Sequence, residues 1–185
     1  VDGTTPTKKL QNAEFKLKCV AAEKEATWKG KWVTVDANNK VTGWVDTQDK
    51  GSALITNANG LAQVIGLDAG TYELYETKAP GGYNKLKAPI QIVITATLDK
   101  TEDNPALTAL TIKVDDSAAE KGDVTKGTVS TTVTNNSGAT LPETGGVGTT
   151  LAQLGKNIPS GQISYVHSNR AGQADLVVLD TGLSG

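Results

Sequence analysis

The sequence predicts an all-β protein, an antiparallel β-sandwich of immunoglobulin-like type. No stretch of roughly twelve residues keeps a helical period, whereas apolar and polar side chains alternate over many short runs. Residues that form turns recur between these runs. Together these observations indicate roughly seven to nine short strands, as in a sandwich, with a closed barrel as the alternative.

The first expected strand covers residues 13–20 (AEFKLKCV), where apolar side chains occupy every second position. Residues 28–56 contain all three tryptophans among Val, Thr and Lys, a composition that favours strands. The sequence DANN at 36–39 is expected to turn the chain within that stretch. Asp and Asn side chains hydrogen-bond to their own backbone, and Asn tolerates a left-handed conformation.

The middle of the chain is divided by strong turn signals. The sequence TNANG at 56–60 predicts a turn, and a short strand at 62–67 follows it. Asp, Ala and Gly at 68–70 are expected to close that strand before the next one at 72–77. The Pro/Gly-rich sequence at 79–83 then predicts a break.

Residues 90–98 (IQIVITATL) give the clearest strand, because nearly every residue has high β propensity. A polar loop is expected at 99–104 and a further strand at 107–114. Residues 117–126 are charged and predict a connection. The last strand of the domain is expected at 128–135.

Composition excludes several function classes. The chain has 18 basic and 20 acidic residues, a net charge of −2, and the two signs are interspersed. It therefore lacks the basic stripe that nucleic-acid binding requires. Cys19 is the only cysteine, so no internal disulfide can form, and its inward position predicts a core residue. We expect the three tryptophans to cover the sandwich, with stacking on a sugar as the alternative.

The segment Leu141-Pro142-Glu143-Thr144-Gly145 resembles the LPxTG pentapeptide that sortases of Gram-positive bacteria recognise. These enzymes cut between Thr and Gly and transfer the new acyl group to an amine. A proline at the second position holds the preceding residue extended, and the glycine lets the backbone bend into an enzyme cleft. The resemblance implies that Thr144 is the point of covalent attachment.

Residues 72–83 (YELYETKAPGGY) resemble the "E-box" (YxLxETxAPxGY) of collagen-adhesin B-type (CnaB) domains in Gram-positive pilins. Residues 10–17 (LQNAEFKL) are similar to the family's LxGAxFxL, with Asn12 in place of Gly. Residues 83–90 look most like the last domain of a backbone, or major, pilin.

The resemblance implies a division of the chain into three parts. Residues 1–137 would form a CnaB-type sandwich, residues 138–150 a flexible linker that carries the sorting motif, and residues 151–185 an atypical tail. That tail is expected either to be disordered or to add a strand.

The function implied is that of a structural subunit domain in a sortase-assembled pilus, or fimbria, secreted to the cell wall of a Gram-positive bacterium. The expected partners are sortase, neighbouring pilin subunits or cell-wall peptide through Thr144, and host surface ligands, but not nucleic acid. No cofactor, metal or enzymatic turnover is expected, beyond a single autocatalytic crosslinking step. The alternative is a stalk or ligand-binding domain of a cell-wall-anchored adhesin or minor pilin.

The same resemblance implies an isopeptide crosslink. In the family, a Lys on the first strand attacks an Asn amide on the last strand, and the E-box Glu hydrogen-bonds to both groups and moves protons. Alternation places Glu76 on the apolar face with Tyr72 and Leu74, and Asn135 on the inward face of the last strand. The resemblance and the alternation therefore both select Glu76 and Asn135. The alternatives are a strand carboxylate paired with a nearby lysine and an asparagine in a turn.

The lysine of this crosslink is not recognisable in the chain. In the family it comes directly before a VDG-like segment, which here is residues 1–3, so it is expected upstream of Val1. Lys8 and Lys9 precede the first expected strand, and Lys16 and Lys18 point away from its apolar face. We therefore expect no intact Lys–Asn crosslink in this chain.

The tail after the pentapeptide carries no apolar segment of the roughly 20 residues that a membrane-spanning helix needs. Short strands are expected at 163–166 and 176–179. We expect residues 174–180 (ADLVVLD) to add to an open edge beside the last strand, because the family's first strand is missing there. The sequence LDTG at 179–182 lacks the context of an aspartic protease.

Overall fold

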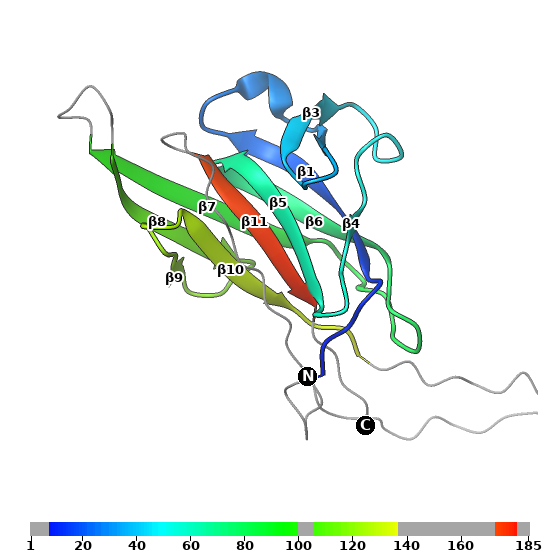
Figure 1. The fold of residues 1–185 in the computed structure, drawn as a ribbon. Coiled ribbons are helices and arrows are strands. Elements are labelled where there is room, and N and C mark those ends of the chain that lie inside the picture. The colour runs from blue at the N-terminus through cyan, green and yellow to red at the C-terminus, as the bar shows by residue number, and fades with distance from the viewer. Residues whose placement is uncertain (1–7, 100–105, 137–172, 181–185) are drawn as a thin grey trace, which may run out of the picture.

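The computed structural model describes residues 8–99, 106–136 and 173–180. These residues form two β-sheets packed face to face (Figure 1), which confirms the expected all-β sandwich of immunoglobulin-like type. The only helical element in the described ranges is a single 3₁₀ turn, η1 (Ala26–Trp28).

The larger sheet, called here the large sheet, is antiparallel throughout. Its strands, in spatial order, are β3 (Val41–Val45), β2 (Trp32–Val35), β1 (Glu14–Ala22), β6 (Gly70–Lys78), β7 (Ile90–Asp99), β8 (Ala106–Val114) and β9 (Glu120–Lys121). The short strand β4 (Leu54–Ile55) pairs with β1 beside this path. Most expected strands are thus confirmed to within a few residues, while β9 lies inside the stretch that we expected to be a connection.

The second sheet, the small sheet, contains β10 (Thr128–Val133), β11 (Gln173–Asp180) and β5 (Leu61–Asp68), in that order. Figure 1 shows β11, in red, between the other two strands. It runs antiparallel to β5 but parallel to β10. The pair is parallel within an otherwise antiparallel sandwich, because β11 starts again beside the beginning of β10 after a long connection. The expected addition of residues 174–180 beside the last strand is confirmed.

The core lies between the two sheets and is built by alternation. In β1, Phe15, Leu17 and Cys19 are fully buried while the residues between them are not. The small sheet contributes residues such as Val64 and Val129 to the same cluster. Cys19 is therefore a core residue, as expected, and burial raises the pKa of its thiol to about 11. Burial of each large apolar side chain favours folding by roughly 1.5–3 kcal/mol.

The two turns in the first half of the chain form as expected. The carboxylate of Asp36 accepts a hydrogen bond from the backbone N–H of Asn38 at 2.8 Å, and Asn39 has a φ of 62°. In the second turn, the side-chain oxygen of Asn57 accepts from the N–H of Asn59 at 2.8 Å. In both turns a short polar side chain bonds to backbone two residues on, which is the mechanism that the sequence indicated.

The link between β5 and β6 is a sharp corner at which the chain passes from one sheet to the other. Only Ala69 separates the two strands, so the turn expected at 68–70 is confirmed in a tighter form. The hydroxyl of Tyr72 donates to the backbone oxygen of Asp68 at 2.6 Å. A Cβ on Gly70 would lie 2.5 Å from the backbone oxygen of Ala21, so the close approach of β1 requires glycine there.

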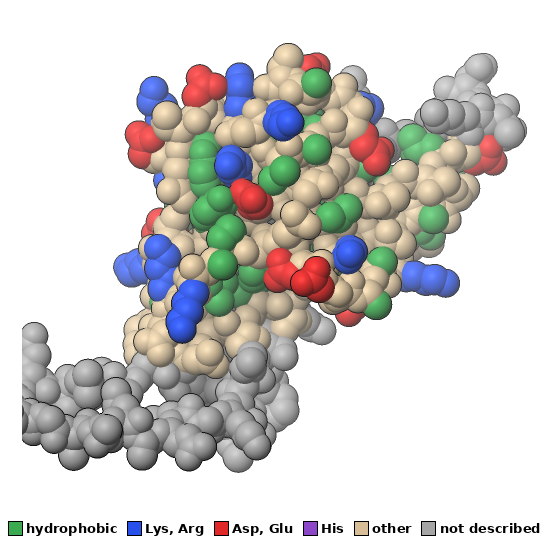
Figure 2. Space-filling model, turned by 180° about the vertical axis from the view of Figure 1, so that it is seen from behind, with side chains coloured by type: hydrophobic (Ala, Val, Ile, Leu, Met, Phe, Trp, Pro, Cys, Tyr) green, Lys and Arg blue, Asp and Glu red, His purple; other side chains and the backbone are tan. Residues whose placement is uncertain are grey.

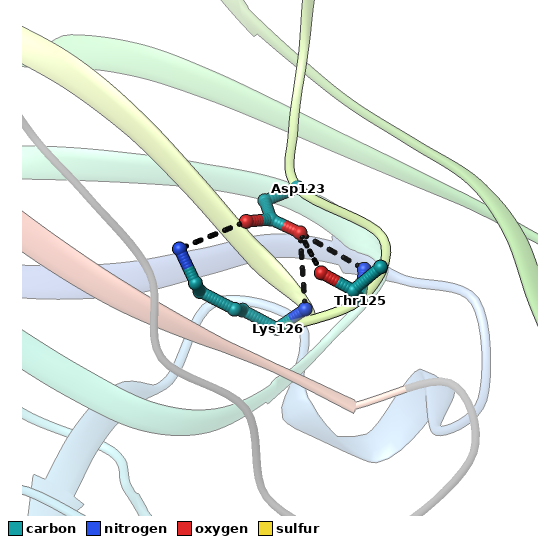
Figure 3. Close-up of polar contacts among 3 residues, drawn as sticks. All are labelled: Asp123, Thr125 and Lys126. Atoms are coloured by element: carbon teal, nitrogen blue, oxygen red, sulfur yellow. Dashed lines mark hydrogen bonds and ion pairs between the residues drawn. The ribbon is translucent and has the colours of Figure 1, made fainter.

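Another turn, at residues 123–126, directly precedes β10 (Figure 3). The carboxylate of Asp123 accepts hydrogen bonds from the backbone N–H of Thr125 at 2.9 Å and of Lys126 at 3.1 Å. It also accepts from the Thr125 hydroxyl at 2.5 Å and pairs with the Lys126 ammonium at 3.2 Å. These donors, the Thr125 hydroxyl first, lower the pKa of Asp123 from 3.8 to about 2. The turn therefore carries a carboxylate that is ionised at almost any working pH.

The face seen in Figure 2 carries basic and acidic side chains interspersed with apolar ones, without an extended patch of one sign. This distribution agrees with the near-neutral composition. No helix within the described ranges is long and apolar enough to cross a membrane.

Candidate functional site: a buried carboxyl–amide pair

Glu76 is one of the few ionisable residues buried in the described ranges. It lies near the end of β6, where every second side chain from Gly70 onward is buried, and only 4% of its surface is exposed. Its register partner on β1 is Phe15, which is fully buried. Alternation therefore turns this carboxyl into the apolar core, as the sequence predicted.

Asn135 follows the end of β10 and has no exposed surface, whereas its neighbour Asn136 is exposed. Its side-chain nitrogen Nδ2 lies 2.8 Å from Oε1 and 3.0 Å from Oε2 of Glu76. The structure thus brings together the two residues selected from the sequence, although they are far apart along the chain. The strand itself stops two residues before Asn135, so alternation predicted the burial correctly beyond the strand's end.

Backbone groups of the loop after β6 also form hydrogen bonds to Glu76 and Asn135. The N–H of Leu86 donates to Oε2 of Glu76 at 2.6 Å, and the backbone oxygen of Asn84 accepts from Nδ2 of Asn135 at 2.9 Å. The N–H of Asn84 also donates to the backbone oxygen of Asn136 at 2.8 Å. Sequence reasoning missed this role of Asn84 and Leu86, because backbone donors leave no residue-type signal. The Pro/Gly break before them indicated only that the chain turns.

The environment favours the protonated form of Glu76. Burial raises the pKa of its carboxyl above the ordinary value of about 4.5. The Leu86 N–H, the Asn135 amide and the charge of Lys85 oppose this effect and offset only part of it. A carboxyl with a raised pKa gains and loses its proton at a higher pH than an exposed one, which suits it to acid–base chemistry.

The amide of Asn135 has one unsatisfied atom. Its Oδ1 is buried and has no hydrogen-bond partner among the described residues. An unpaired buried polar atom costs roughly 1–3 kcal/mol. A half-turn of the amide would exchange Nδ2 and Oδ1, so that a protonated Glu76 could donate to the oxygen. The pair can therefore polarise an amide carbonyl and accept a proton from a group that attacks it.

Three described lysines of the N-terminal region have other partners. The Lys16 ammonium donates to the backbone oxygen of Gln48 at 2.7 Å, and the Lys18 ammonium lies 3.7 Å from Glu73. Lys8 lies over the ring of Tyr83, 5.8 Å from its centre. None of these three contacts Glu76 or Asn135, and β11 beside β10 contains no lysine. The expectation of no crosslink in this chain stays a prediction.

The sorting pentapeptide, Leu141 to Gly145, lies outside the described residues, as does the possible strand at 163–166. Its role therefore stays a prediction. The boundaries expected at 137/138 and at 150/151 also fall outside these residues.

Trp32 lies on β2 and Trp44 on β3, at one end of the large sheet, and Trp28 lies in η1. The rings of Trp28 and Trp44 stack with centroids 5.3 Å apart, and Trp44 also stacks on Tyr72 at 6.2 Å. Trp28 and Trp44 pack against the core and Trp32 is buried, which confirms that they cover the sandwich. Beside them lies an open groove of about 400 Å³ whose lining includes Lys31 and Lys40.

The first part of the chain matches a known protein family. A family model described as "SpaA: Prealbumin-like fold domain" matches residues 1–105. This range includes β1 to β7 and Glu76, and it ends before Asn135. No curated protein matches the chain.

Proposed function

Because the chain belongs to the SpaA family of prealbumin-like fold domains, the family of Gram-positive pilin backbone domains, we propose that it is a structural domain of a sortase-assembled surface pilus. Its all-β sandwich fits a pilin or adhesin structural domain. We further propose that it is a CnaB-type domain, secreted and attached to the Gram-positive cell wall. The single observation that carries the proposal is the buried pair of Glu76 and Asn135.

Attachment is proposed to occur through the pentapeptide at 141–145. Sortase would break the amide bond between Thr144 and Gly145 and hold the Thr144 acyl group. An amine of a neighbouring subunit or of cell-wall peptide would then form a new amide bond with that carbonyl. The segment from Gly145 onward would leave with a free amino group, so every bond broken is matched by one formed.

The buried pair is proposed to assist an intramolecular isopeptide bond when a lysine upstream of Val1 is present. A lysine in this dry environment loses its proton readily and becomes a nucleophile. Its Nζ would attack the side-chain carbonyl carbon of Asn135, while protonated Glu76 donates to the amide oxygen. Glu76 would then carry the proton of the attacking amine to the departing nitrogen, and ammonia leaves.

Such a bond would suit a fibre subunit. The chain has one cysteine and therefore no internal disulfide to resist extension. A covalent bond between a strand early in the sequence and Asn135 late in the domain's sequence would carry tension past the sandwich without unfolding it.

The attachment is tested with the full chain, a sortase that recognises LPxTG and triglycine as the amine. We expect a product that ends at Thr144 joined to triglycine, seen by mass spectrometry, and no product from Thr144→Ala. An uncut wild-type chain would contradict the proposal.

The crosslink is tested by adding one lysine before Val1 and measuring intact mass. We expect the extended chain to be lighter by one ammonia, and to keep its full mass when Glu76→Ala is introduced. Adding arginine in place of the lysine is the matched control, because it preserves charge without a nucleophilic amine. Full mass in the lysine-extended chain would overturn the role proposed for the pair.

A second candidate is a ligand-binding domain of an anchored adhesin or minor pilin, favoured by the groove beside Trp28 and Trp44. Stacked indoles and two lysines suit an acidic sugar. Titration of tryptophan fluorescence with uronic-acid oligosaccharides tests it. Lys40→Ala should weaken binding, and Lys29→Ala, which lies outside the groove lining, should not.

A further inference from the structure

The small sheet depends on a strand from the far end of the chain. In the described part of the chain, β5 and β10 pair with β11 and not with each other. Six residues of β11 are in register with β10, and six are in register with β5. Without β11, the backbone N–H and C=O groups along the facing edges of both strands would lose these partners. We call the space between β5 and β10 the strand slot.

The strands that border the strand slot contribute side chains to the shared core. Val64 and Leu67 of β5 and Val129 and Val133 of β10 are all at most 2% exposed. The two strands that border the slot, β5 and β10, are therefore held in place by packing against the large sheet. Each presents a row of backbone N–H and C=O groups toward the slot. This is the arrangement in which an added strand is bound by main-chain hydrogen bonds on both sides.

The strand that fills the slot is tied to the domain only through a long connection. It begins at Gln173, 40 positions after β10 ends at Val133. For a tether of this length the effective concentration of the strand is on the order of millimolar or below. A second copy of the chain carries the same segment, which fits the same slot in the same register.

The segment has the composition of a strand that pairs on both edges. Residues 174–180 (ADLVVLD) contain four consecutive apolar residues, two of them β-branched, and no proline or glycine. An aspartate lies near each end of this run, in register with Thr128 and Val133 of β10. A segment of this composition readily forms strand pairs when a slot of matching length is open.

We propose that the strand slot is an acceptor site for a β-strand, filled by residues 173–180 of the same chain and, by exchange, by residues 173–180 of a second copy. In the uncut chain, this exchange links two copies without covalent chemistry. The sorting pentapeptide at 141–145 lies within the connection. This step rests on the proposed function: sortase cleavage after Thr144 removes the tether and makes the strand exchangeable at ordinary protein concentrations.

The slot is tested first by hydrogen exchange on the full-length protein. Val177→Pro removes a backbone N–H in the middle of β11 and should prevent its pairing. We expect the amides of β5 and β10 to exchange at least about tenfold faster in this variant, while β6 and β7 keep their protection. Val177→Thr, which keeps the N–H and the branched side chain, is the matched control. Unchanged protection of β5 and β10 in Val177→Pro would overturn the proposal.

Exchange is tested with a fluorescent peptide of residues 172–182 and full-length protein. The peptide should bind Val177→Pro readily and wild type roughly tenfold more slowly, because the tethered strand must leave first. Sortase-cut wild type should accept it at nearly the rate of the variant. A peptide that does not bind Val177→Pro overturns the acceptor site. A wild-type chain that sortase cannot cut contradicts the proposed function, and the variant arm still decides the slot.

Discussion

The large and small sheets differ in how far apart their strands lie along the chain. In the large sheet, β6, β7 and β8 pair as sequential neighbours, and β1 pairs with β6 about 50 to 65 residues away. In the small sheet, β11 pairs with β10 and β5, which precede it by about 45 and 110 residues. Closing longer loops costs more entropy, so the large sheet should form first and hold most tightly. One sandwich can therefore contain a sheet built from a continuous part of the chain and a sheet that a distant segment completes.

The largest effect should come from the core of the large sheet. Phe15→Ala removes a fully buried ring from β1 and leaves a cavity, which should lower the free energy of unfolding by about 3–5 kcal/mol. Denaturant unfolding measures it. The control is Ile55→Ala, because Ile55 is 55% exposed, and it should change stability by less than about 0.5 kcal/mol. Similar losses in both variants would mean that this sheet does not dominate stability.

The next effect concerns the junction of the two sheets. Asn135→Ala removes the donor to Glu76 and to the backbone oxygen of Asn84, and it leaves the buried Glu76 carboxyl without this partner. We expect a loss of about 1–3 kcal/mol in unfolding free energy. Asn136→Ala is the matched control, since that side chain is exposed and its backbone oxygen is retained. Equal stability of Asn135→Ala and wild type would show that the pair does not couple the sheets.

A smaller effect is the pH dependence that Glu76 imposes. Its pKa is raised in the folded state, so its contribution to stability is fully present below the ordinary pKa of about 4.5 and is lost as the pH rises through the folded value. Wild type should therefore lose stability relative to Glu76→Gln, which cannot ionise, over the range in which the pH rises from about 4.5 through the folded pKa. Thermal unfolding across that range measures the difference. Parallel pH profiles for the two proteins would contradict the burial of an ionisable carboxyl.

The smallest effect is expected at the turn that begins β10. The pKa of Asp123 is lowered, so its contribution is present above the ordinary value of 3.8 and is lost as the pH falls toward 2. Asp123→Asn should slightly lower the melting temperature at neutral pH and weaken its fall in acid. Asp116→Asn, at another exposed position, serves as the control. If both variants behave alike, the turn does not stabilise the small sheet.

Local patterns predicted most of the large sheet and both polar residues of the site. Alternation is a property of a few consecutive residues, so Phe15 and Glu76 could be assigned to the inner face without knowing their partners. Asn135 followed from the same rule applied to β10. The short strand β9 was missed, because two residues, Glu120 and Lys121, carry no periodic signal.

Neighbouring residues alone were enough to predict the strands, the Asp and Asn turns, the sandwich class and the inward direction of Glu76 and Asn135. The contact between the Leu86 N–H and the Glu76 carboxyl depends on the folded chain, since a backbone group has no sequence signature. The tertiary structure also decided that β11 lies between β5 and β10 and runs parallel to β10. Strand composition predicts that a segment pairs, whereas its direction and its two partners depend on which edges the rest of the fold leaves open.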